Sequence, residues 1–288
     1  MFTTSIVFPQ SKVNVNSLKE YGGKAFKVDD DEPYTGRVFD LNESTGKKTL
    51  QGKYKNGLKT GKWTYWHSNG KKEEEISYKN GLETGKWTEW YYNGKMEREG
   101  TYKDGKKDGK WTHWRENGEK ISEVSYKDGK DDGVWTQWWE NGQKYSENTY
   151  KDGERDGLRT GWYESGQKQS EGTWKDGGRD GLETRWYENG QKSSEGNYKG
   201  LKMDGLWIGW YENGQKRKES TWKDGERDGL WTQWYENGQK KYEITYKDGK
   251  EDGLKIRWHG NGQKFIEGTY KDGEEISLKR WNQDGSVY

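Results

Sequence analysis

The sequence predicts an all-β fold, an elongated array of β-hairpins built from about ten copies of a 24-residue unit. The unit is clearest at residues 228–251, DGLWTQWYENGQKKYEITYKDGKE. Rows of 24 residues align a tryptophan, a tyrosine and a glycine in fixed columns, represented here by Trp234, Tyr246 and Gly238. Each column is named below after its residue in this unit. A period of this length is typical of stacked repeats, and the 42 glycines interrupt the chain too often for helices.

The composition also indicates a one-dimensional architecture. Hydrophobic residues make up 26% of the chain, too few to fill a rounded core of several layers, and 51 basic and 50 acidic residues nearly cancel. Units that contact only their neighbours fit this composition. The net charge of +1 argues against a nucleic acid partner. Without cysteine there are no disulfides or thiolate ligands, and no apolar run is long enough to span a membrane.

The N-terminal segment lies outside the array. Residues 1–35 are predicted to form an N-terminal segment and cap over the first hairpin. The residues expected to supply that cap are Tyr21, Phe26, Val28 and Tyr34. Residues 1–10 look like the tail of a shortened secretory signal peptide, which favours export to the cell envelope; otherwise the cytoplasm is expected, and the localisation stays open.

The repeat array is predicted to cover residues 36–273, beginning with a degenerate copy. Residues 274–288 are predicted to form a C-terminal capping segment. There Trp281 falls one position early for its column, and Asp284–Gly285 replaces the usual Asn-Gly. An end that leaves the register of the repeat is what a cap requires.

Each unit reads as two strands joined by tight turns. Residues 230–236 and 239–247 are strand-length, rich in Trp, Tyr, Thr and Ile, and bounded by Asn-Gly and Asp-Gly. A two-residue turn at Asn237–Gly238 would place Trp231 on one face with Ile244 and Tyr246. A three-residue loop ending in a left-handed Gly238 would place Trp234 there instead, together with Lys240.

The three-residue loop is our prediction, because the Trp234 and Tyr246 columns are the most regular and should line one buried face. The Trp231 column contains Arg159, Glu183 and Lys255 in place of tryptophan. A buried position would not accept these charges, so the tryptophans of this column are predicted to be exposed or half-exposed.

The pattern G-x-W-T-x-W-Y-E-N-G-Q-K-x-x-E-G-x-Y-K-D-G-x-x-D-G, over about residues 36–285, resembles the bacterial variant of the MORN repeat. The resemblance implies β-hairpins stacked into an elongated, curved, single-layer antiparallel sheet, a solenoid of MORN-type repeats. It also implies a scaffold for protein interaction or homodimerisation, links to membrane lipids, and, among bacterial members, antitoxin or immunity partners. None of these roles maps onto particular residues, since the shared columns look structural.

No catalytic or metal site is predicted. The Glu243 column is occupied in nine copies, whereas a catalytic carboxylate pair is singular, so these glutamates are expected to bridge to a lysine such as Lys240. Asp-Gly turns such as residues 128–133 could suggest calcium, but intervening lysines oppose it. The three histidines form no ligand set, so no cofactor is expected.

The remaining candidate is a ladder of aromatic residues. Its members are Trp63, Trp87, Trp111, Trp135, Trp207 and Trp231, with Tyr91, Trp139, Tyr163, Tyr187, Tyr211 and Tyr235 beside them. These rings either cover the second side of the sheet or form a recognition surface. The hypothesis is a non-enzymatic repeat scaffold that binds a protein or peptide partner through this aromatic face, with an antitoxin or immunity role as a narrower form. The alternative is a cell-surface carbohydrate-binding module.

Overall fold

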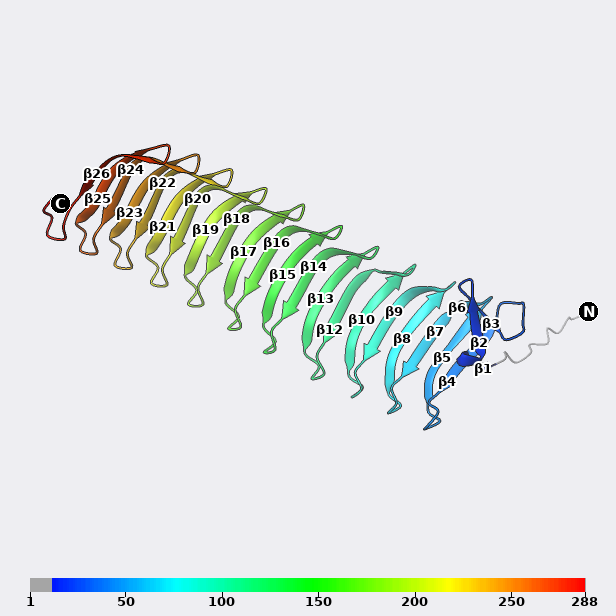
Figure 1. Cartoon of the computed structure of the whole chain (residues 1–288). Helices are drawn as coiled ribbons and strands as arrows, with labels where there is room; N and C mark the ends of the chain where they lie inside the picture. The colour runs from blue at the N-terminus through cyan, green and yellow to red at the C-terminus, as the bar shows by residue number, and fades with distance from the viewer. Residues whose placement is uncertain (1–11, 288) are drawn as a thin grey trace, which may run out of the picture. The chain divides into compact units, whose positions relative to one another are not determined.

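The computed structural model describes residues 12–287, and within them the chain consists of β-strands and one short 3₁₀ helix (Figure 1). The predicted signal-peptide remnant at residues 1–10 lies outside the described residues. The chain divides into two compact units, residues 1–142 and residues 143–288. The all-β prediction is confirmed, whereas the cap and array boundaries stay a prediction.

The first unit contains one sheet of antiparallel hairpins that follow one another in chain order, with Lys12–Asn14 added in parallel beside Gly36–Leu41. Leu18–Tyr21 and Lys24–Lys27 form a separate two-stranded antiparallel sheet. Its elements are β1 (Lys12–Asn14), η1 (Val15–Ser17), β2 (Leu18–Tyr21), β3 (Lys24–Lys27), β4 (Gly36–Leu41), β5 (Lys48–Lys55), β6 (Leu58–Lys59), β7 (Gly61–Trp66), β8 (Lys72–Lys79), β9 (Leu82–Trp90), β10 (Met96–Lys103), β11 (Lys106–Lys107), β12 (Gly109–Trp114), β13 (Lys120–Lys127) and β14 (Lys130–Trp138).

The second unit repeats the same arrangement without interruption, each strand pairing antiparallel with the next. Its strands are β15 (Lys144–Lys151), β16 (Glu154–Trp162), β17 (Lys168–Lys175), β18 (Gly178–Trp186), β19 (Lys192–Lys199), β20 (Lys202–Trp210), β21 (Lys216–Lys223), β22 (Glu226–Trp234), β23 (Lys240–Lys247), β24 (Lys250–Trp258), β25 (Lys264–Lys271) and β26 (Glu274–Arg280). Each 24-residue repeat thus contributes two strands with tight turns at both ends, as predicted.

The Asp-Gly turns are two-residue turns of type I′. In the turn between β23 and β24, Asp248 has φ 47° and Gly249 has φ 80°, and Lys247 pairs with Lys250. Both central residues of such a turn need positive φ, which Asp tolerates and Gly adopts freely. The sequence Asp-Gly therefore specifies this turn locally.

The Asn-Gly turns are three-residue loops, as predicted. The Tyr235 amide donates to the Gln239 carbonyl at 2.8 Å, and the Gly238 amide donates to the Tyr235 carbonyl at 3.0 Å. Gly238 has φ 83°, in the left-handed region. The Asn237 side-chain oxygen accepts from the Gln239 amide at 3.1 Å, which explains the Asn at this position.

A β-bulge next to this loop decides which side chains share a face. Gln233 lies opposite Tyr242, whereas Trp234 lies opposite Lys240, so Lys241 is an extra residue in its strand. An extra residue reverses the in-and-out alternation for everything beyond it. Trp234 and Lys240 do share a face, but the residues further along β23 lie on the opposite face from the one predicted.

The predicted face assignment is therefore wrong beyond the bulge. Trp231 lies opposite Ile244 and shares its face with Tyr246, while Trp234 shares the other face with Glu243. We call the side that carries the Trp231, Ile244 and Tyr246 columns the tyrosine face. The side that carries the Trp234, Lys240 and Glu243 columns is called the glutamate face.

The core of the first unit lies on its tyrosine face. Trp63, Trp87 and Trp111 are only 1%, 9% and 7% exposed, which contradicts the prediction that this column is exposed. Trp87 stacks on Trp111 with ring centroids 5.1 Å apart, and Tyr102 contacts Trp111 edge-on at 5.0 Å. In the second unit the same column is less covered, and Trp207 and Trp231 are half-buried.

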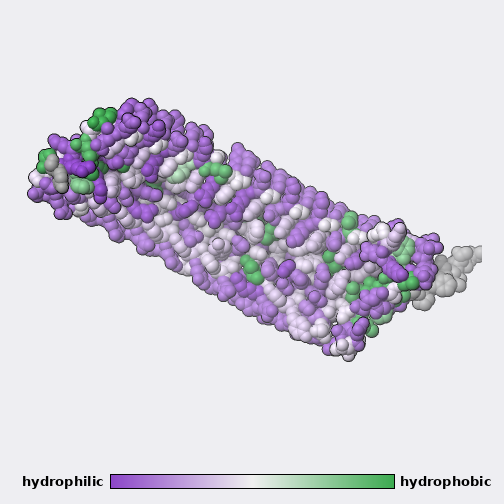
Figure 2. All heavy atoms as spheres, viewed as in Figure 1, coloured by the Kyte–Doolittle hydropathy of each residue, from purple (hydrophilic) through white to green (hydrophobic). Residues whose placement is uncertain are grey.

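The N-terminal residues pack at the beginning of this core. Tyr34 and Val38 are buried in the same cluster as Trp63. The Ala25 amide donates to the Gly57 carbonyl at 2.9 Å, and the Gly57 amide donates to the Tyr34 carbonyl at 2.8 Å. These bonds attach the segment that contains β3 to the two-residue turn at Asn56–Gly57, which occupies the Asp-Gly position of the repeat. Most of the surface visible in Figure 2 is hydrophilic.

Candidate binding site

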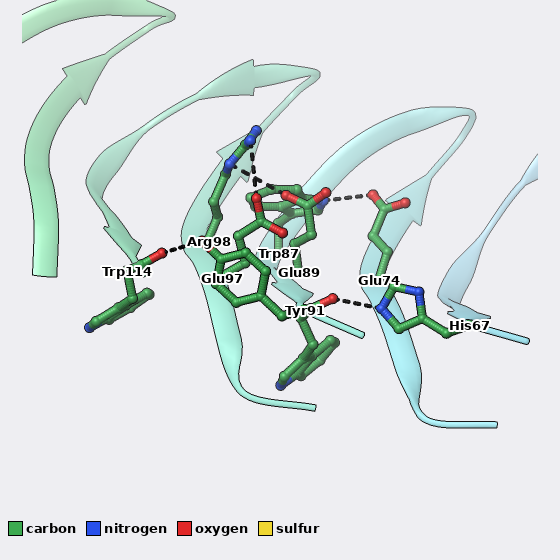
Figure 3. Close-up of polar contacts among 9 residues, drawn as sticks. His67, Glu74, Trp87, Glu89, Tyr91, Glu97, Arg98 and Trp114 are labelled. Carbon is green, nitrogen blue, oxygen red and sulfur yellow. Dashed lines mark hydrogen bonds and ion pairs between the residues drawn. The ribbon is translucent and has the colours of Figure 1, made fainter. Parts of the chain in front are cut away.

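Most of the predicted aromatic ladder serves the sheet itself. The Trp87 indole N–H donates to Glu74 Oε1 at 2.6 Å, that of Trp111 to the Thr101 carbonyl at 3.2 Å, and that of Trp207 to the Asn197 carbonyl at 3.0 Å. Their polar edges are therefore occupied within the chain. Figure 3 shows the Trp87 bond to Glu74 beside the ion pairs of Arg98 with Glu89 and Glu97.

The tyrosines of the Tyr235 column hold neighbouring repeats together. Each phenol hydroxyl donates to the backbone carbonyl of the Trp234-column residue in the next repeat, as Tyr91 does to Trp114 at 2.7 Å (Figure 3). The same bond is made by Tyr163, Tyr187, Tyr211 and Tyr235. At this position His67 contacts the Trp90 carbonyl at 2.8 Å. These hydroxyl groups therefore have a structural role, because each one links its repeat to the next.

The glutamate face is electrically paired, and the predicted bridge between Lys240 and Glu243 is confirmed. In the same way, Lys144 Nζ lies 2.6 Å from Glu147 and 5.4 Å above the Trp162 ring of the next repeat. Burial opposes the ionisation of Glu75, but hydrogen bonds from Lys62 and Lys72 outweigh it and lower its pKa. This face therefore offers little net charge to a partner.

An exposed row of leucines also lies on the glutamate face of the second unit, beside the threonines opposite it. Its members are Leu158, Leu182, Leu206, Leu230 and Leu254, each between 44% and 50% exposed. The corresponding residues of the first unit include Lys62, Lys86 and Lys110. The leucine row was not singled out in the sequence, although its fixed spacing was visible there.

The tyrosine face of the second unit is strongly basic. Its basic residues, placed by their cross-strand partners, are Arg155, Arg159, Arg179, Arg185, Lys218, Arg227, Lys255, Arg257 and Arg280, and its acidic residues are Glu183, Glu251 and Glu275. The near-zero net charge of the chain conceals this segregation, because the opposite face pairs its lysines with glutamates.

Four of these arginines surround one cavity of about 490 Å³. Arg155 and Arg159 extend from β16, and Arg179 and Arg185 from β18. The other residues that line the cavity are Tyr163, Gln169, Ser170, Trp174, Trp186 and Ser193. We call this the arginine pocket.

Three of the arginines are held by neighbouring groups. Arg155 Nε donates to the Tyr150 hydroxyl at 3.2 Å, and its guanidinium lies 5.1 Å from the Trp174 ring. Arg179 donates to the Tyr198 hydroxyl at 3.1 Å and pairs with Glu183 at 3.3 Å. Arg185 pairs with the same carboxylate at 2.6 Å.

Arg159 is the arginine with the weakest compensation. It donates to the Ser170 hydroxyl at 3.3 Å and forms no ion pair within the described residues. Burial, followed by the charge of Arg155, lowers its pKa, and the nearby Glu183 carboxylate only partly opposes this. Four guanidinium groups thus line the pocket, and within the described residues Glu183 is the one carboxylate that forms ion pairs with them.

The sequence identified part of this pocket. The replacement of tryptophan by Arg159 and Glu183 was visible as variation within the Trp231 column. Arg155 and Arg185 were missed because they belong to different columns, although the alternation along β16 and β18 places both on the face of Arg159 and Glu183. Repetition of arginine at Arg155 and Arg179, 24 residues apart, was the available signal.

The described residues were compared with the requirements of a metal site and of a membrane-spanning helix. No group of three or more His, Cys, Asp or Glu side chains is arranged there to hold a metal ion. Over the same residues, no helix has the length and apolarity needed to cross a membrane.

Comparison with protein families finds a repeated match to the MORN repeat variant. The matched segments are residues 59–80, 83–104, 107–128, 131–152, 155–176, 179–199, 203–224 and 227–248. Comparison with curated proteins gives no significant match.

Among solved structures, the chain is similar to parts of two complexes, TcdB2-TccC3-Cdc42 and TcdB2-TccC3. Each match has 10% identity, a TM-score of 0.20 and 88% coverage of this chain. The chain spans 17% and 18% of the length of those solved chains. Similarity at this level supports no conclusion about fold or function.

Proposed function

Because the chain belongs to the MORN repeat variant family, whose members are generally non-enzymatic scaffolds, we propose that it binds an acidic segment of a protein partner. The proposed contact surface is the tyrosine face of the second unit. The observation that carries the proposal is the excess of basic over acidic side chains on that face, in a chain whose net charge is only +1.

The chemistry of this face suits an acidic protein segment. Arginine and tryptophan are the residues most enriched at the energetic centres of protein interfaces, and both occur here, with Trp207 and Trp231 half-buried among the arginines. A positive surface also steers an acidic partner into register and excludes basic ones. A toxin as the acidic partner would be the antitoxin or immunity form of this proposal.

The guanidinium groups that lie over the aromatic rings favour a peptide ligand over nucleic acid or sugar. Arg227 lies 5.5 Å from the Trp222 ring, 5.3 Å from Trp231 and 5.2 Å from Tyr246. Guanidinium groups therefore already occupy positions over rings on which bases or sugars would have to stack. Carboxylates can instead pair with the guanidinium edges without displacing them.

The test measures binding of labelled peptides to the whole chain. An acidic peptide of alternating Glu and Leu is compared with a basic peptide, single-stranded DNA and a glycan set. The double variant Lys218→Glu/Arg227→Glu reverses charge outside the arginine pocket. We expect the acidic peptide to bind and this variant to weaken its Kd by at least about tenfold, with stronger binding at low salt.

The matched control is Leu206→Lys/Leu230→Lys on the glutamate face, which introduces a residue that the first unit carries in that column. We expect it to bind the acidic peptide like the unmodified chain. Tighter binding of DNA or a glycan, or loss of peptide binding in the leucine variant but not in the charge-reversed one, would contradict the proposal. Circular dichroism of each variant verifies its folding.

A further inference from the structure

We propose that the arginine pocket is a binding site for a doubly charged phosphoryl group, carried by a phosphorylated side chain of the protein partner. The source of the group rests on the proposed function above, whereas the site itself rests on the pocket. Its components are the cavity of about 490 Å³, the four arginines around it and the incompletely compensated Arg159.

The charge of the pocket calls for a dianion. Glu183 satisfies parts of Arg179 and Arg185, at 3.3 and 2.6 Å, but no second carboxylate within the described residues forms an ion pair with any of the four arginines. A single carboxylate entering the pocket would leave two positive charges uncompensated, whereas a phosphoryl dianion would leave one. Partly buried guanidinium groups of like charge repel one another, so a bound dianion removes an unfavourable interaction.

The donors are arranged for such a group before it binds. Arg155 is fixed by the Tyr150 hydroxyl and the Trp174 ring, and Arg179 by the Tyr198 hydroxyl. Ordering these long side chains therefore costs little additional entropy when the ligand arrives. Planar guanidinium groups bind phosphoryl oxygens through paired, charge-assisted hydrogen bonds.

The other side chains at the pocket add to this chemistry. The Ser170 hydroxyl contacts Arg159 at 3.3 Å and can rotate to donate to an anion. Trp174 forms an apolar wall, whereas the ring of Trp186 lies on the glutamate face, 5.9 Å from Lys168 Nζ. The volume exceeds what one phosphoryl group fills, so the side chain that carries the group has room to enter with it.

The substitution of Arg159 for tryptophan distinguishes this repeat from its neighbours. In the repeats that keep the ring, such as those of Trp111 and Trp207, the indole lies against the glycine of the preceding strand. At Arg159 the flat ring is replaced by a charged fork that reaches Ser170. The pocket therefore exists where the array departs from its own pattern.

The first experiment titrates the whole chain with inorganic phosphate, and separately with acetate, at constant ionic strength by isothermal calorimetry. We expect saturable phosphate binding that is tighter than acetate binding. Arg159→Gln should weaken the phosphate Kd at least about tenfold, the effect of removing a hydrogen bond to a charged group. Arg257→Gln, which lies on the same face in the column of Arg185, should leave it unchanged.

The second experiment identifies the source of the group. A phosphoserine peptide, its unphosphorylated form and vesicles containing an anionic phospholipid are compared. We expect the phosphopeptide alone to bind in a way that free phosphate displaces and Arg159→Gln weakens. Vesicle binding that depends on Arg159 would overturn the assignment to a protein partner.

The site itself would be overturned by phosphate binding no tighter than acetate binding, or by an unchanged Kd in Arg159→Gln. If that variant does not fold, Arg159→Trp restores the residue of the column and provides the same test. The acidic-peptide result with Lys218→Glu/Arg227→Glu is independent of these measurements, so a failure of the phosphoryl site is distinguishable from a failure of the proposed function.

Discussion

At the scale of single residues, the tryptophans of the tyrosine face depend on the absence of side chains beside them. A Cβ added at Gly100 would lie 2.1 Å from Trp111 Cδ2, and one added at Gly196 would lie equally close to Trp207. The indole thus rests directly on the backbone of the neighbouring strand. Glycine in a strand here marks close approach of a ring, not a flexible position.

Gly100→Ala is predicted to destabilise the first unit by about 1–3 kcal/mol, because the Trp111 ring must leave its position. Thermal unfolding followed by tryptophan fluorescence measures the loss. The matched control is Gly172→Ala in the same column, where the nearest atom to the new Cβ is Glu183 Cγ at 3.5 Å, an ordinary contact. Equal losses in the two variants would contradict the packing argument.

At the scale of elements, each hairpin is specified by its own turn residues. Positive φ at both positions of the Asp-Gly turns and at the glycine of the Asn-Gly loops is a local requirement, met by local sequence. One turn departs from this rule. Between β19 and β20 the pair is Gly200–Leu201, and Leu201 has φ 72°.

Leu201→Gly is predicted to stabilise the second unit by about 1 kcal/mol, because a left-handed leucine carries a backbone penalty that glycine avoids. Leu201 is exposed, so little burial is lost. Chemical denaturation measured by circular dichroism checks the prediction. The control Leu206→Gly removes a comparably exposed leucine from within β20, where it should destabilise; a gain there too would refute the turn-based explanation.

At the scale of the whole molecule, the strands of the repeats in each compact unit pair with their immediate neighbours in the chain. Stability in such an array is a sum of unit and nearest-neighbour contributions. Loss of one complete 24-residue repeat should therefore leave the remaining hairpins in their original pairing. Loss of half a repeat should disrupt the pairing, because it removes a single strand and reverses the direction of all the strands that follow.

Deletion of residues 203–226, one full period, is predicted to give a folded chain. Its urea m-value should fall by about a twelfth, in proportion to the lost surface. Deletion of residues 203–214 is the control and should disrupt the second unit. Analytical ultracentrifugation and urea unfolding compare the two chains, and global unfolding of the full-period deletion would contradict a modular array.

The fold could be predicted from the sequence because its determinants are local. Gly238 and Gly249 impose turns, the residues between them alternate as strands, and the 24-residue period repeats the result. The bridge of Lys240 to Glu243 was predicted as well, but it forms because the bulge at Lys241 places these two residues, three apart in one strand, on the same face. The face of Trp231 did not follow, because one bulge residue, Lys241, reverses the alternation.

The sequence by itself determined the hairpin, its turns and its repetition, because each depends on the conformational preferences of a few adjacent residues. Only the tertiary structure decided which columns share a face, that Trp63 and Trp111 are buried, and that Arg155, Arg159 and Arg185 surround one pocket. The physical reason is that the face on which a residue lies depends on every bulge between it and the turn. A bulge of a single residue costs little locally, yet it exchanges the two surfaces of the sheet.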